Sequence, residues 1–194
     1  TKRLRACWLS LFSESALAYG AAHGYASGEI AVAVVIQQMV ASEISGIGFS
    51  VHPVTQEPDI QLIEACLGLG EAIVSGRIVP DQFIVERDSF QILESVIGEQ
   101  KEALWLGDGN TKPVWQELDG RGSQPKISTS QVTEYAGILA RLHDHYGHPI
   151  DTEWAIENGN FQILQARPIT TLAAEYDQSL FDQSLEWHFC VRRP

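Results

Sequence analysis

The stretch DTEWAIENGNFQILQARPIT, from Asp151 to Thr170, is the part of the sequence that decides the fold. Two segments within it read as β-strands, Asp151 to Glu157 and Phe161 to Arg167. They are separated by residue types that tolerate left-handed backbone angles and are common in tight turns, namely Asn158, Gly159 and Asn160. The stretch therefore predicts a β-hairpin with a three-residue loop.

The length of this loop determines which side chains share a face of the hairpin, because strand side chains alternate between faces and cross-strand partners lie on the same face. With three residues in the loop, the predicted cross-strand pairs are Glu157 with Phe161, Ala155 with Ile163, Glu153 with Gln165, and Asp151 with Arg167. The apolar residues of the opposite face are then Trp154, Ile156, Leu164 and Ala166. A two-residue loop would put Glu153 and Gln165 on opposite faces, so the predicted polar face depends on the register.

The polar face has the chemistry of a phosphoryl-transfer site. Hard oxygen donors such as the Glu153 carboxylate and the Gln165 carbonyl suit Mg²⁺, which completes its shell with water and substrate phosphates. Arg167 beside them offers forked donors to a phosphoryl group that carries charge in the transition state. The spacing alone fits a second interpretation equally well, an exposed hairpin whose surface Arg–Asp pair contributes little to stability.

Three blocks of the sequence are long and specific. They are LQARPIT at the end of the hairpin stretch, VIQQMVASEISGIGFSVHPVT from Val35 to Thr55, and IEACLGLGEAIVSGRIVPDQFIVER from Ile63 to Arg87. Together they resemble the ATP-grasp nucleotide-binding domain of the phosphoenolpyruvate synthase and pyruvate phosphate dikinase family, whose wider relatives include the rifampin phosphotransferases. The resemblance implies that residues 1–171 are the C-terminal part of this ATP-binding domain, an α+β lobe with a mainly antiparallel sheet and flanking helices. Residues 172–194 are left as an unassigned tail.

The same resemblance implies roles for individual residues. Glu153 and Gln165 would hold Mg²⁺, and Arg167 would be the catalytic residue that stabilises the transferring phosphoryl group. The residues that would line the adenine pocket are Gln37, Met39 and Val40. The further carboxylates that would lie near the nucleotide are Glu64 and Glu71.

The residues themselves leave alternatives open for three of these positions. Met39, without the resemblance, is better explained as a residue that fills a gap in the core. Glu64 stands among apolar neighbours and needs a partner, which is either ribose, a metal-bound water or an Arg in a purely structural pair. Glu71 lies in Gly68 to Arg77, a segment that is neither a Walker loop nor a dinucleotide fingerprint and is explained more simply as a tight turn.

The charge and composition of the chain exclude some classes of partner. Its 25 acidic and 13 basic residues give a formal net charge of -12, whereas a nucleic-acid partner requires a basic footprint. No apolar run is long enough to span a bilayer, and the N-terminal charges precede no signal-like core. Cys7, Cys66 and Cys190 form no CxxC pair, which indicates reduced thiols. We therefore expect a cytoplasmic protein with neither a nucleic-acid nor a membrane partner.

The rest of the sequence predicts the elements around the hairpin. A helix is expected over residues 2–19, a buried strand over 31–39, and further strands over 46–51, 61–67, 81–87 and 90–96. Residues 99–124 are expected to be irregular. The clearest helix spans residues 128–146, where Ser128 and Gln131 form a capping box and Gly147 ends the helix. His143 and His145 near its end do not share a helix face, which argues against a metal site there.

By resemblance, the parent enzyme uses MgATP to phosphorylate one of its own histidines and then passes the group to pyruvate, with AMP and phosphate as the other products. None of the six His residues lies in a segment that resembles the phosphohistidine motif. The N-terminal ATP-grasp lobe, the phosphohistidine domain and the pyruvate site are therefore expected outside these residues. The alternatives are a rifampin-type antibiotic phosphotransferase, and a nucleotide-binding or structural fragment that is inactive alone.

Overall fold

The computed structural model describes residues 2–22, 33–107, 112–169 and 188–189. The chain divides into two compact units, one made of Thr1–Met39 with Gln178–Pro194 and the other of Val40–Asp177. The second unit contains the predicted hairpin, so it is the unit that positions the candidate site.

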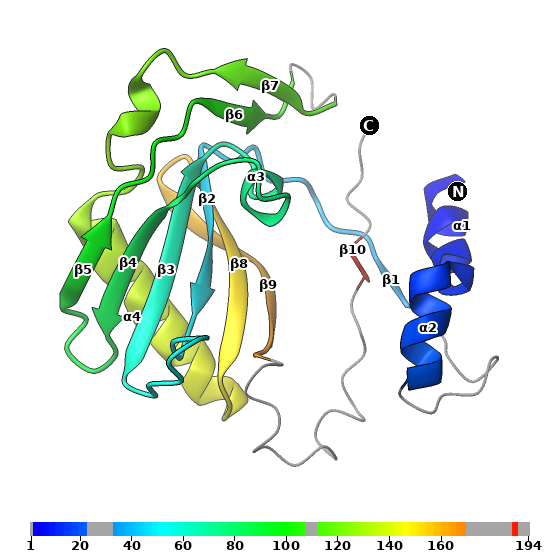
Figure 1. The fold of residues 1–194 in the computed structure, drawn as a ribbon, viewed down its shortest axis with the longest axis horizontal. Helices are drawn as coiled ribbons and strands as arrows, with labels where there is room; N and C mark the ends of the chain where they lie inside the picture. The colour runs from blue at the N-terminus through cyan, green and yellow to red at the C-terminus, as the bar shows by residue number, and fades with distance from the viewer. Residues whose placement is uncertain (1, 23–32, 108–111, 170–187, 190–194) are drawn as a thin grey trace. The chain divides into compact units, whose positions relative to one another are not determined.

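The second unit is built on a six-stranded antiparallel sheet (Figure 1). Its strands are β2 Ile44–Phe49, β3 Ile60–Leu67, β4 Asp81–Glu86, β5 Ile92–Val96, β8 Ile150–Glu157 and β9 Asn160–Pro168. They lie in the order β5-β4-β3-β2-β8-β9, and every neighbouring pair is antiparallel. The predicted α+β class with a mainly antiparallel sheet is confirmed, as are the four strands expected between residues 46 and 96.

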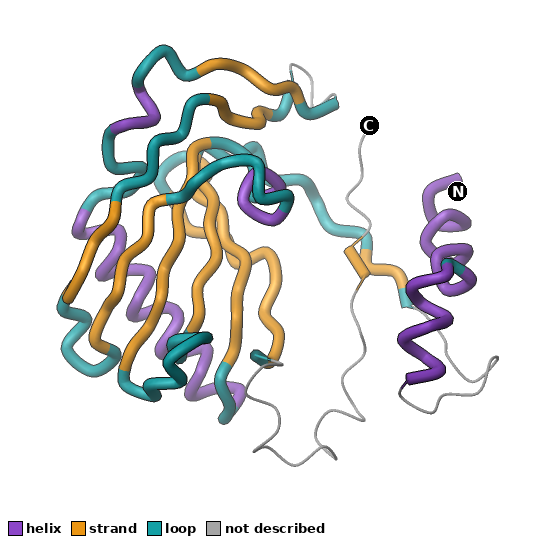
Figure 2. The backbone as a smooth tube through the Cα atoms, in the orientation of Figure 1, coloured by secondary structure: helices purple, strands orange, loops and turns teal. Residues whose placement is uncertain are grey.

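The helix α4, Thr129–Tyr146, covers one face of this sheet (Figure 2). It begins with the predicted capping box, in which the Ser128 side chain accepts from the Gln131 N–H and the Gln131 side chain accepts from the Ser128 N–H. It ends at Gly147, whose φ of 71° is a conformation that glycine adopts without strain. The buried residues that join helix and sheet are Ile63, Phe83, Val85, Val132, Tyr135, Leu139, Trp154 and Ile156.

A glycine in the central strand lets the helix approach the sheet. A Cβ at Gly48 would lie 2.5 Å from the hydroxyl oxygen of Tyr135, so no larger residue fits opposite this ring. The Tyr135 hydroxyl forms a buried hydrogen bond with the Thr152 hydroxyl, which donates to the Gly48 carbonyl at 3.1 Å. This contact gives both hydroxyl groups a hydrogen-bond partner, as buried polar groups require where water is excluded.

Residues 99–124 contain a hairpin that the sequence did not predict. It consists of β6 Glu102–Trp105 and β7 Val114–Glu117, followed by the 3₁₀-helix η2 Arg121–Ser123. The Gln100 side chain fixes this region to the end of β3, because it accepts from the Leu67 N–H at 2.9 Å and donates to the Leu67 carbonyl at 3.0 Å. A side-chain amide here imitates the hydrogen bonds of a neighbouring strand.

A buried ion pair attaches the same region to β4. The Lys126 ammonium donates to Asp81 Oδ1 at 2.8 Å and to the carbonyl oxygens of Gly98 and Gly122, and both charged side chains are 0% exposed. Asp81 also accepts from the backbone N–H groups of Gly98 at 3.0 Å and Lys126 at 2.7 Å. All three ammonium donors are used, which is the condition under which a buried ion pair is tolerated.

The first unit differs from the sequence prediction in two places. Instead of one helix over residues 2–19, it has α1 Lys2–Leu9, η1 Ser10–Phe12 and α2 Glu14–Ala22. The break falls at Ser13, which is extended and whose hydroxyl accepts from the Ala16 N–H at 3.3 Å, so this serine acts as a cap that starts a new helix.

The predicted buried strand over residues 31–39 is also wrong within the described part of that range. Only Val34–Val35 is a strand, β1, and it pairs in parallel with β10, His188–Phe189. Ile36 directly after it is 69% exposed. A two-stranded sheet of this length has too few neighbours to bury both faces of a strand. Ala31 and Val32 lie outside the described residues.

Two expectations about the chain's environment can be compared with the described residues. Within residues 2–22, 33–107, 112–169 and 188–189, no helix has both the length and the apolar character that a membrane crossing requires. The prediction of reduced thiols holds for Cys66, which is free and buried, whereas Cys7 is disulfide-bonded, so the prediction is wrong for that residue. Cys190 lies outside the described residues.

Candidate functional site

The turn of the predicted hairpin contains two residues and not three. Glu157 pairs with Asn160, so only Asn158 and Gly159 lie between the strands β8 and β9. Both have left-handed φ angles, 51° and 75°, as a type I′ turn requires. The preference of Asn-Gly for this compact turn explains why the predicted three-residue loop is wrong.

A β-bulge at Leu164 restores the pairing that the shorter turn would have destroyed. Next to the turn, Ile156 lies opposite Phe161 and Trp154 opposite Ile163. The register then shifts by one residue, so that Leu164 is extra on β9, as in a β-bulge. Beyond the bulge, Glu153 lies opposite Gln165 and Asp151 opposite Arg167.

The two pairs that define the predicted polar face are therefore confirmed as neighbours. The two pairs predicted closer to the turn are wrong: Glu157 lies opposite Asn160 and Ala155 opposite Gln162. Phe161 takes up the core position beside Trp154 and Tyr135, with ring centroids 5.4 Å from each. Leu164 and Ala166, which were expected in the core, are only half-buried.

The polar residues of the hairpin continue two rows of side chains that cross five of the six strands, from β9 to β4. The strand registers align Gln82, Glu64, Ile47, Glu153 and Gln165. The adjacent row aligns Ile84, Leu62, Phe49, Asp151 and Arg167. Both rows lie on the face opposite α4, because α4 packs on the alternate residues of the same strands. We call this surface, made of these ten residues, the polar sheet face.

Asp151 and Arg167 form the ion pair of the polar sheet face. Arg167 Nε donates to both carboxylate oxygens of Asp151, at 2.8 and 2.9 Å. The Asp151 side chain is 14% exposed and that of Arg167 63% exposed, so the carboxylate is held inside and the guanidinium reaches out. Burial raises the pKa of Asp151, and the hydrogen bond and charge of Arg167 oppose that shift. The hydrogen bond that Arg167 donates to Asp151 in turn raises the pKa of Arg167.

Glu153 and Gln165 are the predicted metal ligands, and the structure puts them directly opposite each other. Burial raises the pKa of Glu153, while the charge of Arg167 lowers it and that of Asp151 raises it. The described residues provide no hydrogen bond to either side chain, in contrast with Asp151 and Arg167 beside them. In that part of the chain, no three His, Cys, Asp or Glu side chains are grouped as a complete metal site.

Glu64 has a partner that the sequence did not suggest. The side-chain amide of Gln82 on the next strand donates to Glu64 Oε1 at 2.8 Å. Of the three partners left open for Glu64, the structural Arg is replaced by this neutral amide, which satisfies the carboxylate without cancelling its charge. Gln82 is the polar residue of this face that the sequence analysis missed, because its contact with Glu64 appears only when β4 is aligned with β3.

The remaining predicted nucleotide ligands are distributed over other elements. Gln37 and Met39 are half-buried residues of the first unit, and Val40 is the half-buried first residue of the second unit. Glu71 is the exposed first residue of the short helix α3, Glu71–Val74. Their nucleotide contacts stay predictions.

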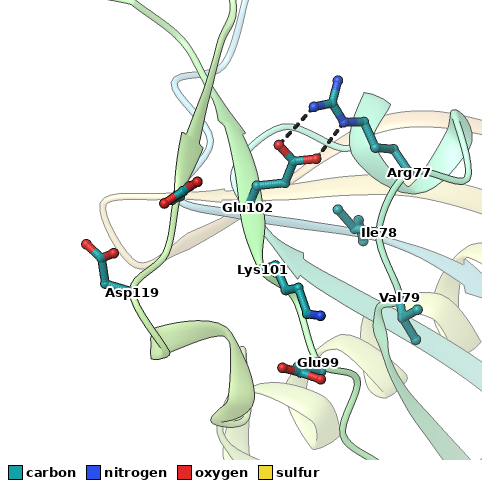
Figure 3. Close-up of a pocket in the computed structure, with 8 residues that line it drawn as sticks. Arg77, Ile78, Val79, Glu99, Lys101, Glu102 and Asp119 are labelled. Carbon is teal, nitrogen blue, oxygen red and sulfur yellow. Dashed lines mark hydrogen bonds and ion pairs between the residues drawn. The ribbon is translucent and has the colours of Figure 1, made fainter.

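A separate pocket of about 490 Å³ lies beside β6 (Figure 3). Its charged lining residues are Arg77, Glu99, Lys101, Glu102, Glu117 and Asp119. Arg77 forms a two-point ion pair with Glu102, at 2.6 and 2.9 Å, and lies 3.9 Å above the ring of Trp115. Its guanidinium is thus engaged by protein groups, and the polar sheet face contributes no residue to this pocket.

An antiparallel sheet that is packed by a helix on one face and carries carboxylate, amide and guanidinium groups on the other defines an ATP-grasp-like lobe. The sequence comparisons agree with this class. The family model described as "Pyruvate phosphate dikinase, AMP/ATP-binding domain" matches residues 1–186. The chain therefore belongs to the pyruvate phosphate dikinase AMP/ATP-binding domain family.

Individual relatives give the same picture. The chain is 42% identical over 175 residues to a probable phosphoenolpyruvate synthase of Archaeoglobus fulgidus, a match that covers 90% of this chain and 23% of the relative. It is 36% identical over 188 residues to the phosphoenolpyruvate synthase of Pyrococcus furiosus, covering 89% of this chain and 22% of that enzyme.

A rifampicin phosphotransferase is also similar. The chain is 36% identical over 171 residues to the enzyme of Streptomyces sviceus, covering 88% of this chain and 20% of the relative. The chain thus spans a quarter or less of the length of the relatives it matches, at 23%, 22% and 20%.

Proposed function

We propose that this chain is the C-terminal part of the nucleotide-binding domain of a phosphoenolpyruvate synthase-like phosphotransferase, and that it binds MgATP on the polar sheet face. Membership of an AMP/ATP-binding domain family supports nucleotide binding. The observation that carries the proposal is the arrangement of Glu153 opposite Gln165 and Asp151 opposite Arg167 on the face of the sheet opposite α4.

The donor set of this face fits magnesium. Glu153 and Gln165 both offer oxygen, the ligand that Mg²⁺ prefers, and two protein ligands are sufficient for an ion that keeps several waters. The burial that raises the pKa of Glu153 also means that a cation beside it would be favoured. When bound, Mg²⁺ would neutralise charge on phosphate oxygens.

Arg167 would bind the transferring phosphoryl group. Only the Nε of Arg167 donates to Asp151 in this pair. The pair therefore orients the guanidinium and leaves its Nη groups available to donate to a phosphoryl group. Fixed donors aimed at developing charge are an effective means of transition-state stabilisation, because they need no reorganisation during the reaction. Asp151 is in this view a positioning residue for Arg167.

The other predicted ligands complete the proposal. Gln37, Met39 and Val40 would receive adenine, Glu64 would contact ribose or a metal-bound water, and Glu71 would lie near the nucleotide. The hydrogen bond from Gln82 would orient Glu64 for that contact.

The phosphoryl acceptor distinguishes two candidate parent reactions. In a phosphoenolpyruvate synthase-like enzyme an intermediate enzyme phosphohistidine would pass the group to pyruvate, through domains outside this chain. The 36% identity with a rifampicin phosphotransferase favours the antibiotic as the second candidate. Formation of AMP by the full-length enzyme with pyruvate alone, or with rifampicin alone, would decide between them.

The nucleotide proposal is tested by calorimetric titration of the chain with ATP, with and without Mg²⁺. We expect metal-dependent binding, and we expect Glu153→Gln to weaken the dependence on Mg²⁺ because an amide is a poorer magnesium ligand than a carboxylate. Glu134→Gln on the exposed side of α4 is the matched control and should bind like the natural chain.

Binding that is equally strong without metal, or in the Glu153→Gln variant, would contradict the metal assignment. If the chain alone gives no heat, the same pair of variants is compared in the full-length enzyme. An unchanged Mg²⁺ requirement there would also contradict it.

A further inference from the structure

A hydrogen-bond network around His143 joins four parts of the second unit at the end of α4. His143 Nδ1 lies 2.9 Å from the hydroxyl of Ser50, the residue after β2. His143 Nε2 lies 3.2 Å from Nη1 of Arg87, the residue after β4. The Ser50 hydroxyl also accepts from the N–H of Ile150 at 2.9 Å, at the start of β8.

The partners of the two ring nitrogens specify one form of the imidazole. A guanidinium nitrogen can only donate, so His143 Nε2 facing Arg87 must accept and therefore carries no proton. The single proton of the neutral ring is then on Nδ1, where it donates to the Ser50 hydroxyl. Only the neutral, Nδ1-protonated form satisfies both contacts.

Protonation of His143 would break this arrangement. It would put an N–H on Nε2 against the Arg87 donor and two cations side by side, so the ring or the guanidinium would have to withdraw. Burial lowers the pKa of His143 first, and the positive charges of Arg87 and His148 lower it further. Asp144, which pairs with Arg87 Nη2 at 2.6 Å, and the carbonyl end of α4 oppose this shift.

The network is connected to the strand that carries Asp151. Ser50 and Ile150 are joined twice, since the Ser50 N–H donates to the Ile150 carbonyl at 2.9 Å and the Ile150 N–H donates to the Ser50 hydroxyl. Asp151 follows Ile150 directly and lies opposite Arg167. A displacement of the Ser50 hydroxyl is therefore transmitted to the first residues of β8.

We propose that neutral His143 is a positioning residue that holds the start of β8 where Asp151 meets Arg167, and that protonation of His143 releases this hold. The inference rests on the proposed function only in treating Asp151 and Arg167 as part of the nucleotide site. A parent enzyme with this network would lose the alignment of Arg167 when acidification protonates His143.

The test is NMR of the 194-residue chain without nucleotide, so that it is independent of the ATP titration. Ring ¹⁵N shifts should show the Nδ1–H form of His143 at pH 7.5 and a titration midpoint below about 6.5, the ordinary value for histidine. The amide signals of Ile150 and Asp151 should shift with the same midpoint. The same pKa shift makes the folded chain less stable in acid. A base whose pKa is lowered on folding reduces the free energy of unfolding as the pH falls below 6.5.

His143→Asn removes the titration and keeps an N–H near the position of Nδ1, so the amides of Ile150 and Asp151 should no longer shift in this pH range. His145→Asn, on an exposed position of the same helix turn, is the matched control and should behave like the natural chain. If His143→Asn does not fold, Arg87→Gln replaces it and should raise the His143 midpoint.

Three results would overturn the inference. They are an Nε2–H tautomer at neutral pH, a midpoint at or above 6.5, and amides of Ile150 and Asp151 that do not respond while His143 titrates. None of these outcomes depends on whether the chain binds ATP, so a failure here is distinguishable from a failure of the nucleotide proposal.

Discussion

Arg167 lowers the pKa values of two half-buried carboxyl groups relative to the effect of burial alone. Its hydrogen bond and charge lower the pKa of Asp151, and its charge lowers the pKa of Glu153, in both cases against the larger effect of burial. In the Arg167→Ala variant we expect both pKa values to rise above those of the natural chain. Side-chain carboxyl ¹³C titration by NMR would measure this, with Arg141→Ala on the exposed side of α4 as the control.

The same substitution has a defined dependence on pH. A carboxyl group whose pKa is raised on folding costs stability at neutral pH, and that cost disappears as the pH falls through the raised value. The loss of stability in Arg167→Ala should thus be greatest near neutral pH and vanish in acid. A loss that is constant with pH would show that Arg167 acts through packing and not through these carboxylates.

Two glycine positions give opposite predictions for the same chemical change. Gly48→Ala should destabilise the chain by about 1–3 kcal/mol, because the new methyl group would overlap the Tyr135 ring at 2.5–3.0 Å. Gly137→Ala in α4 should instead stabilise it by about 0.4–1 kcal/mol, because its methyl group would meet Phe90 at an ordinary 3.8 Å and alanine favours helix. Urea unfolding of both variants measures the difference, and a similar effect at the two positions would contradict the close approach of α4 to β2.

At the scale of elements, the hairpin shows that turn length alone does not determine a face. The Asn158-Gly159 turn would by itself separate Glu153 from Gln165, and the extra residue Leu164 brings them together again. A β-bulge changes the side on which all later residues of a strand point, because side chains alternate with a period of two.

Deletion of Leu164 tests this role of the bulge. Without the extra residue, the ladder can run regularly from Trp154 opposite Ile163 to Glu153 opposite Gln165, so Asp151 should stay opposite Arg167. The Arg167 Nε–H signal in NMR should therefore persist, because the contact between Arg167 Nε and Asp151 is kept. A deletion variant that loses this signal would refute this account of the hairpin.

At the scale of the whole molecule, the sequence was most informative where local signals were strong. The capping box at Ser128 and the apolar spacing of the helix after it predicted α4 to within one residue of its start. The strands from Ile44 to Val96 were predicted for the same reason, since each is an apolar run between turn residues. The pairing of Asp151 with Arg167 was correct although the turn was not, because two deviations cancelled.

What the sequence did not predict depends on contacts between distant residues. The strands β6 and β7 are only four residues each and have no strong apolar pattern, and they are fixed by the Gln100 side chain and the Asp81–Lys126 pair. Gln82 was missed because its role appears only when β4 and β3 are aligned. The pairing of Glu153 with Gln165 could be predicted from the sequence, whereas the burial of these two side chains could not.

The ion pair between Asp81 and Lys126 has a consequence for the rate of amide hydrogen exchange in the loops around it. The amides of Gly98 and Lys126 lie outside any strand or helix, and such amides generally exchange their hydrogens with solvent quickly. Here both donate to the buried Asp81 carboxylate. We expect deuterium to enter these two loop amides as slowly as it enters the backbone of β4. Asp81→Asn should accelerate exchange at both amides together, so that one buried carboxylate sets the hydrogen-exchange rate of both loop segments.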